Sequence, residues 1–263
     1  MKNMKIGIFD SGLGGLIIAK AIRKAMPEYD YAYLGDTKRV PYGNRSHETV
    51  YQFTRQAVDY LFKKENCAII VIACNTASAR ALRKLQKEYG SKRKILGVLI
   101  PTAEEVAKYI RVGVLATRGT VASNTFPKEI KKINKKIRVF QNSAPILVPF
   151  AEEGEKEFAI VFIEKYLKPL LSRNIEALIL GCTHYPIFKK EFRKVLPEEV
   201  KIISQDNIIP RKLKNYLFNH QEISKKLSKN KSMKILVTDK THNIEELTKK
   251  WFGGKTKPKL INL

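Results

Sequence analysis

The chain has 263 residues, of which 44% are apolar, and its formal net charge at pH 7 is +25. This length and composition indicate a folded protein with room for two domains, and they exclude an intrinsically disordered chain. No apolar run approaches the roughly 20 residues that span a bilayer, and the first residues lack the apolar core of a secretory signal, so we expect a cytoplasmic protein.

Short apolar segments alternate with helical patterns along the chain. Because these segments are apolar on both faces, they are typical of parallel strands that helices cover on each side. We predict strands at 5–9, 31–34, 68–73, 95–98, 112–116, 139–141, 178–180, 201–203 and 234–238. We predict helices at 14–26, 47–64 (with Ser46 as N-cap), 77–90, 102–110, 122–136, 153–172, 188–195, 207–219 and 243–252. This order predicts an α/β fold.

The strand–turn–helix rhythm restarts near the middle of the chain. The segment "KIGIFDSGLGG" opens it at residue 5, and "RVGVLATRGT" opens it again at residue 111. Roughly 70 residues after each start, a strand ends in a cysteine, Cys74 in the first half and Cys182 in the second. This pattern indicates two similar halves that meet near Gly97–Pro101.

Polar residues come directly after several of the predicted strands. They form the clusters Asp10-Ser11-Gly12, 35–43, Cys74-Asn75-Thr76, Thr117–Thr120 and Cys182-Thr183-His184. Open α/β sheets bind ligands beyond the carboxyl ends of their strands, and hydroxyl, amide and free backbone N–H groups at a helix start can hold an anion. These clusters therefore predict a site for a small ligand that carries carboxylates.

Two familiar motifs are only partly matched. Gly12, Gly14 and Gly15 come after a strand, as in dinucleotide-binding loops, but their spacing differs from G-x-G-x-x-G. Cys74 and Arg80 have the C-x5-R spacing of cysteine phosphatases, but no glycine between them allows a tight phosphate-binding loop. We favour neither interpretation, and a phosphatase would leave Cys182 without a role.

The three cysteines differ in their C-terminal neighbours. Cys67 begins an apolar run and is predicted to be structural, whereas Cys74 and Cys182 directly precede Asn-Thr and Thr-His respectively. An odd number of cysteines without a CxxC pair disfavours disulfides, and the scattered histidines offer no zinc spacing. We therefore expect no metal, and we expect Cys74 and Cys182 to face each other across a cleft between the two halves.

A thiolate and a thiol on opposite sides of one chiral carbon can invert the configuration of that carbon. One sulfur removes a proton from one face, and the other sulfur returns a proton to the opposite face. If each sulfur lies roughly 3–3.5 Å from the carbon, the two are about 6–7 Å apart, which is too far for a disulfide. Their protonation states would titrate as a coupled pair.

Six motifs resemble those of glutamate racemases, in the same order and spacing. They are "IGIFDSGLGGL" (6–16), "YLGDTKRVPYG" (33–43), "VIACNTASA" (71–79), "GVLATRGTVAS" (113–123), "PILVPFAEEG" (145–154) and "LILGCTHYP" (178–186). The family consists of cofactor-independent enzymes that supply D-glutamate for peptidoglycan. Aspartate racemases share the two-thiol plan, but their glycine-rich start and their second cysteine motif differ.

The resemblance implies roles for individual residues. Cys74 and Cys182 would be the two bases, associated with D-glutamate and L-glutamate respectively. Asp10 would lie near Cys74, and Glu152 and His184 near Cys182, as further catalytic residues that tune or assist proton transfer. The substrate contacts implied by the family are Asp10, Ser11, Tyr42, Gly43, Asn75, Thr76, Thr117, Thr120, Thr183 and His184.

The resemblance also implies the architecture and the partners. We expect two three-layer α/β domains with pseudo-twofold symmetry, formed by residues 1–97 with 208–263 and by residues 98–207, with the active site between them. We expect glutamate as substrate, no cofactor, no membrane partner and a homodimer. Two alternatives stay open: a racemase for aspartate or another amino acid, and a basic scaffold that binds nucleic acid or a protein partner.

Overall fold

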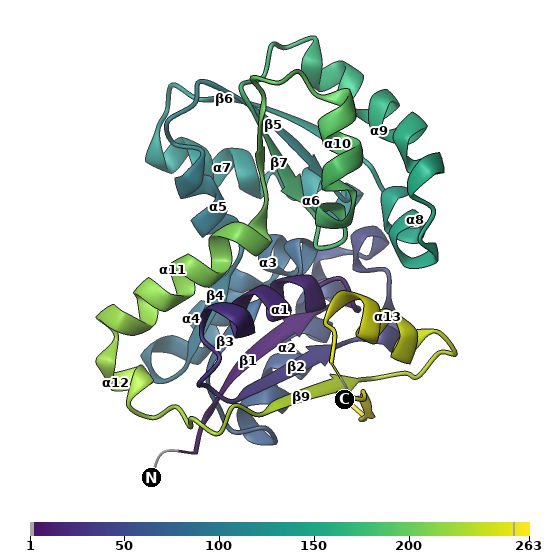
Figure 1. The fold of residues 1–263 in the computed structure, drawn as a ribbon. Helices are drawn as coiled ribbons and strands as arrows, with labels where there is room; N and C mark the ends of the chain where they lie inside the picture. Colours follow the sequence, from purple (N-terminus) through teal and green to yellow (C-terminus); the bar gives the residue numbers. More distant parts are fainter. Residues whose placement is uncertain (1–2, 255) are drawn as a thin grey trace.

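Two parallel β-sheets organise the computed structural model, which describes residues 3–254 and 256–263 (Figure 1). The first sheet has the strand order β10-β9-β2-β1-β3-β4 and the second has the order β6-β5-β7-β8. The strands of the first sheet are β1 (Lys5–Asp10), β2 (Tyr31–Gly35), β3 (Cys67–Ile72), β4 (Lys94–Gly97), β9 (Met233–Val237) and β10 (Lys259–Leu260). Those of the second are β5 (Arg111–Ala116), β6 (Arg138–Ser143), β7 (Ala177–Gly181) and β8 (Lys201–Ile203). All nine predicted strands are present, with bounds within two residues of those predicted.

Helices cover both faces of each sheet, so the predicted α/β architecture with two domains is confirmed. The first sheet lies between α1 (Leu16–Ala25), α11 (Gln205–Asn219) and α13 (Ile244–Trp251) on one face and α2 (His47–Lys63), α3 (Asn75–Arg80) and α4 (Leu82–Tyr89) on the other. The second lies between α5 (Leu99–Glu105), α6 (Arg118–Ser123) and α7 (Thr125–Ile133) and the opposite helices α8 (Leu147–Glu153), α9 (Lys156–Leu171) and α10 (Lys189–Val195).

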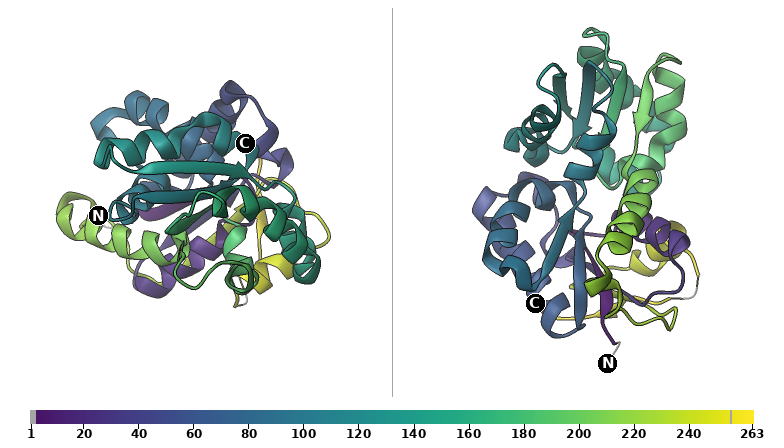
Figure 2. Two further views of the ribbon diagram at one scale, coloured as in Figure 1. Left: turned by 90° about the horizontal axis from the view of Figure 1, so that it is seen from above. Right: turned by 90° about the vertical axis from the view of Figure 1, so that its left-hand side faces the viewer.

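The chain crosses between the two sheets at α5 and at α11. Helix α11 begins after β8 of the second sheet and packs against α1 of the first, as the side view in Figure 2 shows. After α12 (Gln221–Ser224), the strands β9 and β10 join the edge of the first sheet beside β2. The C-terminal segment thus returns to the first sheet. The proposed domain limit at residue 208 falls inside α11 and stays a prediction.

Four predicted helices differ from those observed. Three of them are each divided between two helices, namely those predicted at 77–90, 122–136 and 153–172. Asn124 (φ 53°) separates α6 from α7, and Gly154 (φ 85°) lies between α8 and α9. A left-handed residue ends a helix because the next backbone hydrogen bond cannot form there. The helix expected at 102–110 instead spans Leu99–Glu105, since Pro101 is tolerated in a first helical turn and does not mark a boundary.

The register of the parallel strands brings their carboxyl ends into line. Asp10 of β1 pairs with Gly35 of β2, Phe9 pairs with Ile72 of β3, and Ala116 of β5 pairs with Gly181 of β7. The polar residues after these strands are therefore neighbours at one edge of each sheet. No helix in the part of the chain that the structure describes is long and apolar enough to cross a membrane.

Candidate active site

A cavity of about 250 Å³ lies between the carboxyl ends of the two sheets. Its lining includes most of the residues predicted from the sequence: Ser11, Tyr42, Gly43, Cys74, Asn75, Thr76, Thr117, Glu152, Cys182, Thr183 and His184. Asp10 and Thr120, which are 1% and 0% exposed, lie behind this lining. The lining residues to which the sequence analysis assigned no catalytic or substrate-binding role are Gly12, Val40, Pro41, Val148 and Pro149, although each lies within a quoted motif.

The two predicted thiols face this one cavity from opposite domains. Cys74 comes after β3 of the first sheet, and Cys182 comes after β7 of the second. Both are 6% exposed, and both are free of disulfides. Cys67 is also free but lies at the start of β3, at the other end of that strand.

Cys74 is held at the start of a helix. Its Sγ accepts a hydrogen bond from the backbone N–H of Ala77 at 3.4 Å and lies 3.2 Å from the Ser11 hydroxyl. Burial and the nearby Asp10 carboxylate raise the pKa of the Cys74 thiol to about 12, although the hydrogen bonds with Ser11 and the Ala77 N–H oppose the shift. The neutral thiol is therefore the stable form of Cys74 at neutral pH.

Asp10 lies between the two domains. Its carboxylate accepts hydrogen bonds from the Gly12 N–H at 3.0 Å and from the Thr183 hydroxyl at 3.4 Å. Burial raises the pKa of Asp10, while the nearby His184 and the backbone N–H groups of Gly12 and Gly15 oppose this rise. Asp10 thus contacts the second domain through Thr183, and its charge also acts on Cys74.

His184 connects Cys182 to Glu152. Its Nδ1 lies 3.8 Å from Cys182 Sγ, and its Nε2 lies 3.1 Å from Glu152 Oε1. Burial lowers the pKa of His184, but the contacts with Cys182 and Glu152 outweigh it and raise the pKa to about 10. Cys182 thus lies beside a cationic imidazole, whereas Cys74 lies near the Asp10 carboxylate, so the surroundings of the two thiols differ. Glu152 contacts His184 rather than Cys182 itself.

Three threonine hydroxyls form a cluster across the domain boundary. Thr76 on α3 lies 2.9 Å from Thr117 and 3.4 Å from Thr120, and Thr117 donates to Thr120 at 3.0 Å. Thr117 also caps α6 by accepting from the Thr120 N–H. Thr120 is therefore a supporting residue, whereas Thr76 and Thr117 reach the cavity.

The side chain of Asn75 is held by a residue that the sequence did not indicate. Gln205, at the start of α11, donates to the Asn75 carbonyl at 2.7 Å and accepts from its amide at 2.8 Å. Gln205 is 1% exposed and comes after β8 of the second sheet. This pair fixes the orientation of an amide that lines the cavity.

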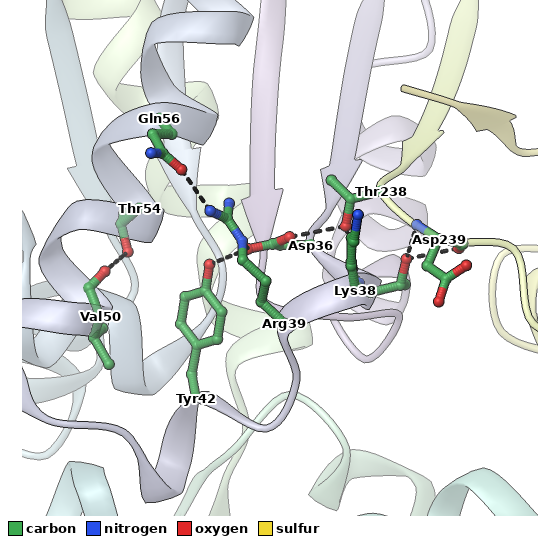
Figure 3. Close-up of polar contacts among 10 residues, drawn as sticks. Asp36, Lys38, Arg39, Tyr42, Val50, Thr54, Gln56, Thr238 and Asp239 are labelled. Carbon is green, nitrogen blue, oxygen red and sulfur yellow. Dashed lines mark hydrogen bonds and ion pairs between the residues drawn. The ribbon is translucent and has the colours of Figure 1, made fainter. Parts of the chain in front are cut away.

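Asp36 holds the loop of residues 37–43 through the contacts drawn in Figure 3, and this loop forms one wall of the cavity. Asp36 is fully buried and accepts hydrogen bonds from Tyr42 at 2.5 Å, Arg39 at 2.6 Å and Thr238 at 2.8 Å. Val40, Pro41, Tyr42 and Gly43 belong to the loop that these contacts hold. The Tyr42 hydroxyl is engaged by Asp36 and its ring packs beside Phe9 and Phe53, so this hydroxyl is not free to bind a ligand.

The fold and the cavity define a two-domain α/β protein in which two free thiols face one small cavity. Among residues 3–254 and 256–263, no group of three or more His, Cys, Asp or Glu side chains is arranged to hold a metal ion. The titratable side chains that line the cavity include Cys74, Cys182, His184 and Glu152, and Asp10 lies behind the lining.

Comparison with known proteins gives the family. Residues 17–205 match the family model described as Asp/Glu/hydantoin racemase. The glutamate racemase of Sulfurihydrogenibium sp. is 38% identical over 99% of this chain and 98% of its own, and that of Aquifex aeolicus is 38% identical over 98% of each. The Francisella tularensis glutamate racemase solved in complex with D-glutamate has a TM-score of 0.92 at 32% identity, covering 100% of this chain and 98% of its own. The chain belongs to the Asp/Glu/hydantoin racemase family, in its glutamate racemase branch, and is an isomerase of the amino-acid racemase class.

Proposed function

We propose that this enzyme interconverts L- and D-glutamate by proton transfer between Cys74, the substrate α-carbon and Cys182, without a cofactor. The observation that carries this proposal is the placement of two free, buried thiols from different domains in one cavity of about 250 Å³. Glutamate is the substrate we favour, because the relatives similar over nearly the full chain are glutamate racemases, two of them 38% identical. A structure of the Escherichia coli enzyme contains L-glutamate.

The two sides of the cavity suit opposite halves of the reaction. Cys182, next to a cationic His184, is the base that removes the α-proton of L-glutamate. Cys74, held as a thiol by its raised pKa, donates a proton to the opposite face. In the reverse direction Cys74 is the base and Cys182 the acid.

The remaining lining residues would bind the substrate. Hydroxyl and amide groups of Ser11, Asn75, Thr76, Thr117 and Thr183 can donate to carboxylates without adding a competing strong base. These oriented donors also stabilise the negative charge that develops when the weakly acidic α-proton leaves. Asp10 acts through its charge on Cys74, and Glu152 acts through its contact with His184.

Three further expectations belong to this proposal. The enzyme works in the cytoplasm, supplies D-glutamate for peptidoglycan, and forms a homodimer. An aspartate racemase is the alternative substrate assignment. The Picrophilus torridus aspartate racemase resembles this chain in fold alone, with a TM-score of 0.57 at 21% identity.

The decisive experiment compares single cysteine variants. We expect Cys74→Ser and Cys182→Ser each to lose racemisation of glutamate by at least about 100-fold, because each removes one of two required bases. Cys67→Ser is the matched control, since it removes a buried thiol outside the cavity and should keep the wild-type rate. Circular dichroism would establish that all three variants are folded.

Incorporation of solvent deuterium at the α-carbon, monitored by proton NMR, tests the same chemistry directly. Full turnover by either Cys74→Ser or Cys182→Ser would contradict the two-thiol mechanism. Faster turnover of aspartate than of glutamate by the wild-type enzyme would instead support the alternative substrate.

A further inference from the structure

We propose that Trp251, on the C-terminal helix α13, is a positioning residue that holds the His184 imidazole against Cys182. This inference rests on the proposed function, in which His184 assists proton transfer at Cys182. Trp251 is not among the residues that line the cavity, so its effect on the reaction passes through His184. No motif in the sequence pointed to this residue.

The two rings form an edge-to-face pair. The centroids of His184 and Trp251 are 5.4 Å apart, and their planes meet at 89°. This is one of the two arrangements that aromatic rings prefer. Trp251 is 5% exposed and His184 is 7% exposed, so the contact is shielded from water.

Packing is needed because the polar contacts of His184 leave one motion free. Cys182 and Glu152 contact only the two ring nitrogens, so packing against the ring carbons must limit the rotation about the side-chain bonds that tilts the ring plane. Gly14 limits this rotation on the side of the first domain: a Cβ there would lie only 2.6 Å from His184 Nδ1 and Cε1. Trp251 provides a second packing contact, from the C-terminal helix.

Helix α13 is placed to give this support from the first domain. It packs against α1, beside the first sheet (Figure 1). At the second domain, Lys250 Nζ lies 3.0 Å from the position that a Cβ on Gly154 would occupy, just beyond Glu152. The end of α13 thus adjoins both His184 and the helix α8 that carries Glu152.

The contribution of Trp251 comes from its ring rather than from its N–H group. Its Nε1 is buried and has no hydrogen-bond partner within the described part of the chain. The indole excludes water from His184, which strengthens the charge interactions of the imidazole in the low-dielectric interior. Phenylalanine can supply the same packing, and alanine cannot.

The test isolates one sulfur at a time with 3-chloroglutamate. Removal of the α-proton by a single thiolate, with loss of chloride from the β-carbon, gives an enamine that takes up water and releases 2-oxoglutarate and ammonium. Under the proposed mechanism, the isomer with L configuration at the α-carbon requires Cys182, and the isomer with D configuration requires Cys74. The rate with each isomer therefore reports on one side of the cavity.

We expect Trp251→Ala to slow elimination from the L isomer by about tenfold or more, because a misplaced catalytic group loses much of its effect. The rate with the D isomer should change less than about twofold, and Trp251→Phe should keep near wild-type rates with both isomers. Phe252→Ala is the matched control. Phe252 is also 5% exposed, but its ring packs against Arg23, whose Cζ lies 5.6 Å from the ring centroid. Trp251→Leu replaces Trp251→Ala if the latter does not fold.

Two results would overturn the role of Trp251. One is an equal loss of elimination rate with the L and D isomers in Trp251→Ala, and the other is a selective loss with the L isomer in Phe252→Ala. His184→Asn separates this inference from the proposed function. If His184→Asn slows the L isomer selectively and the Trp251 variants do not, only the inference is wrong. If His184→Asn has no selective effect, the proposed assistance of Cys182 by His184 is wrong.

Discussion

Replacing Asp36 with asparagine tests whether one buried carboxylate holds the loop of residues 37–43, which forms one wall of the cavity. The Asp36 carboxylate accepts from Tyr42, Arg39 and Thr238, at 2.5, 2.6 and 2.8 Å respectively. Asparagine has nearly the same shape, but its amide nitrogen would face at least one of these donors and cannot accept from it. The half-buried guanidinium of Arg39 would also lose its counter-charge.

The expected loss of stability can be worked out from this geometry. Breaking a buried ion pair by removing one partner typically costs about 3–5 kcal/mol. The Arg39 side chain is 20% exposed and keeps its contacts with Gln56 and the Phe53 ring, so we expect a smaller loss, about 2–3 kcal/mol of unfolding free energy. The KM for glutamate should rise more than kcat falls, because the Tyr42–Gly43 wall moves while neither sulfur contacts Asp36.

The assay combines urea denaturation with racemisation kinetics. Glu88→Gln is the matched control, because Glu88 accepts hydrogen bonds from Tyr51 and Arg55, also a tyrosine and an arginine, both at 2.5 Å. Its side chain is 31% exposed and lies outside the cavity, so the expected cost is below about 1 kcal/mol, with KM unchanged. Equal destabilisation of Asp36→Asn and Glu88→Gln, or an unchanged KM in Asp36→Asn, would refute this reasoning.

Two further predictions concern His184. Gly14→Ala would bring a Cβ within 2.6 Å of the buried His184 ring. We therefore expect the unfolding free energy measured by urea denaturation to fall by about 1–3 kcal/mol and racemisation to slow markedly. Wild-type activity would contradict this contact. The folded-state pKa of His184 is raised to about 10, above its usual value near 6.5, so its protonation stabilises the fold fully below about pH 6.5 and progressively less up to pH 10. The difference in unfolding free energy between the wild type and His184→Asn should therefore shrink between pH 7 and pH 10, and a constant difference would show that the imidazole is not held as a cation.

The strands and the two thiols could be predicted because local patterns encode them. Each strand is a short apolar run, and a parallel sheet necessarily brings the carboxyl ends of such runs to one edge. The polar residues after Asp10, Cys74, Thr117 and Cys182 therefore had to meet wherever the sheets faced each other. Topology alone does not say that the two edges face each other. The similar sequence surroundings of Cys74 and Cys182 suggested that step, and the resemblance to a family supported it.

The supporting residues could not be predicted because they depend on packing between distant segments. Thr238 is 202 positions from Asp36, and Gln205 is 130 positions from Asn75. Trp251 reaches His184 only because the C-terminal segment returns to the first sheet. Its place in an amphipathic helix predicts burial, but not which side chains it is buried against.

The unlike surroundings of the two thiols have a kinetic consequence under the proposed mechanism. A raised pKa holds Cys74 as a thiol, whereas Cys182 lies beside the cationic His184, so the two sulfurs are suited to different halves of the reaction. The two enantiomers have equal free energy in water, so kcat/KM must be the same in both directions whatever the protein does. The asymmetry can therefore appear only in the individual values of kcat and KM. The direction with the smaller kcat must also have the smaller KM, by the same factor. A catalyst for a symmetric equilibrium can thus be built from two different half-sites without violating that symmetry.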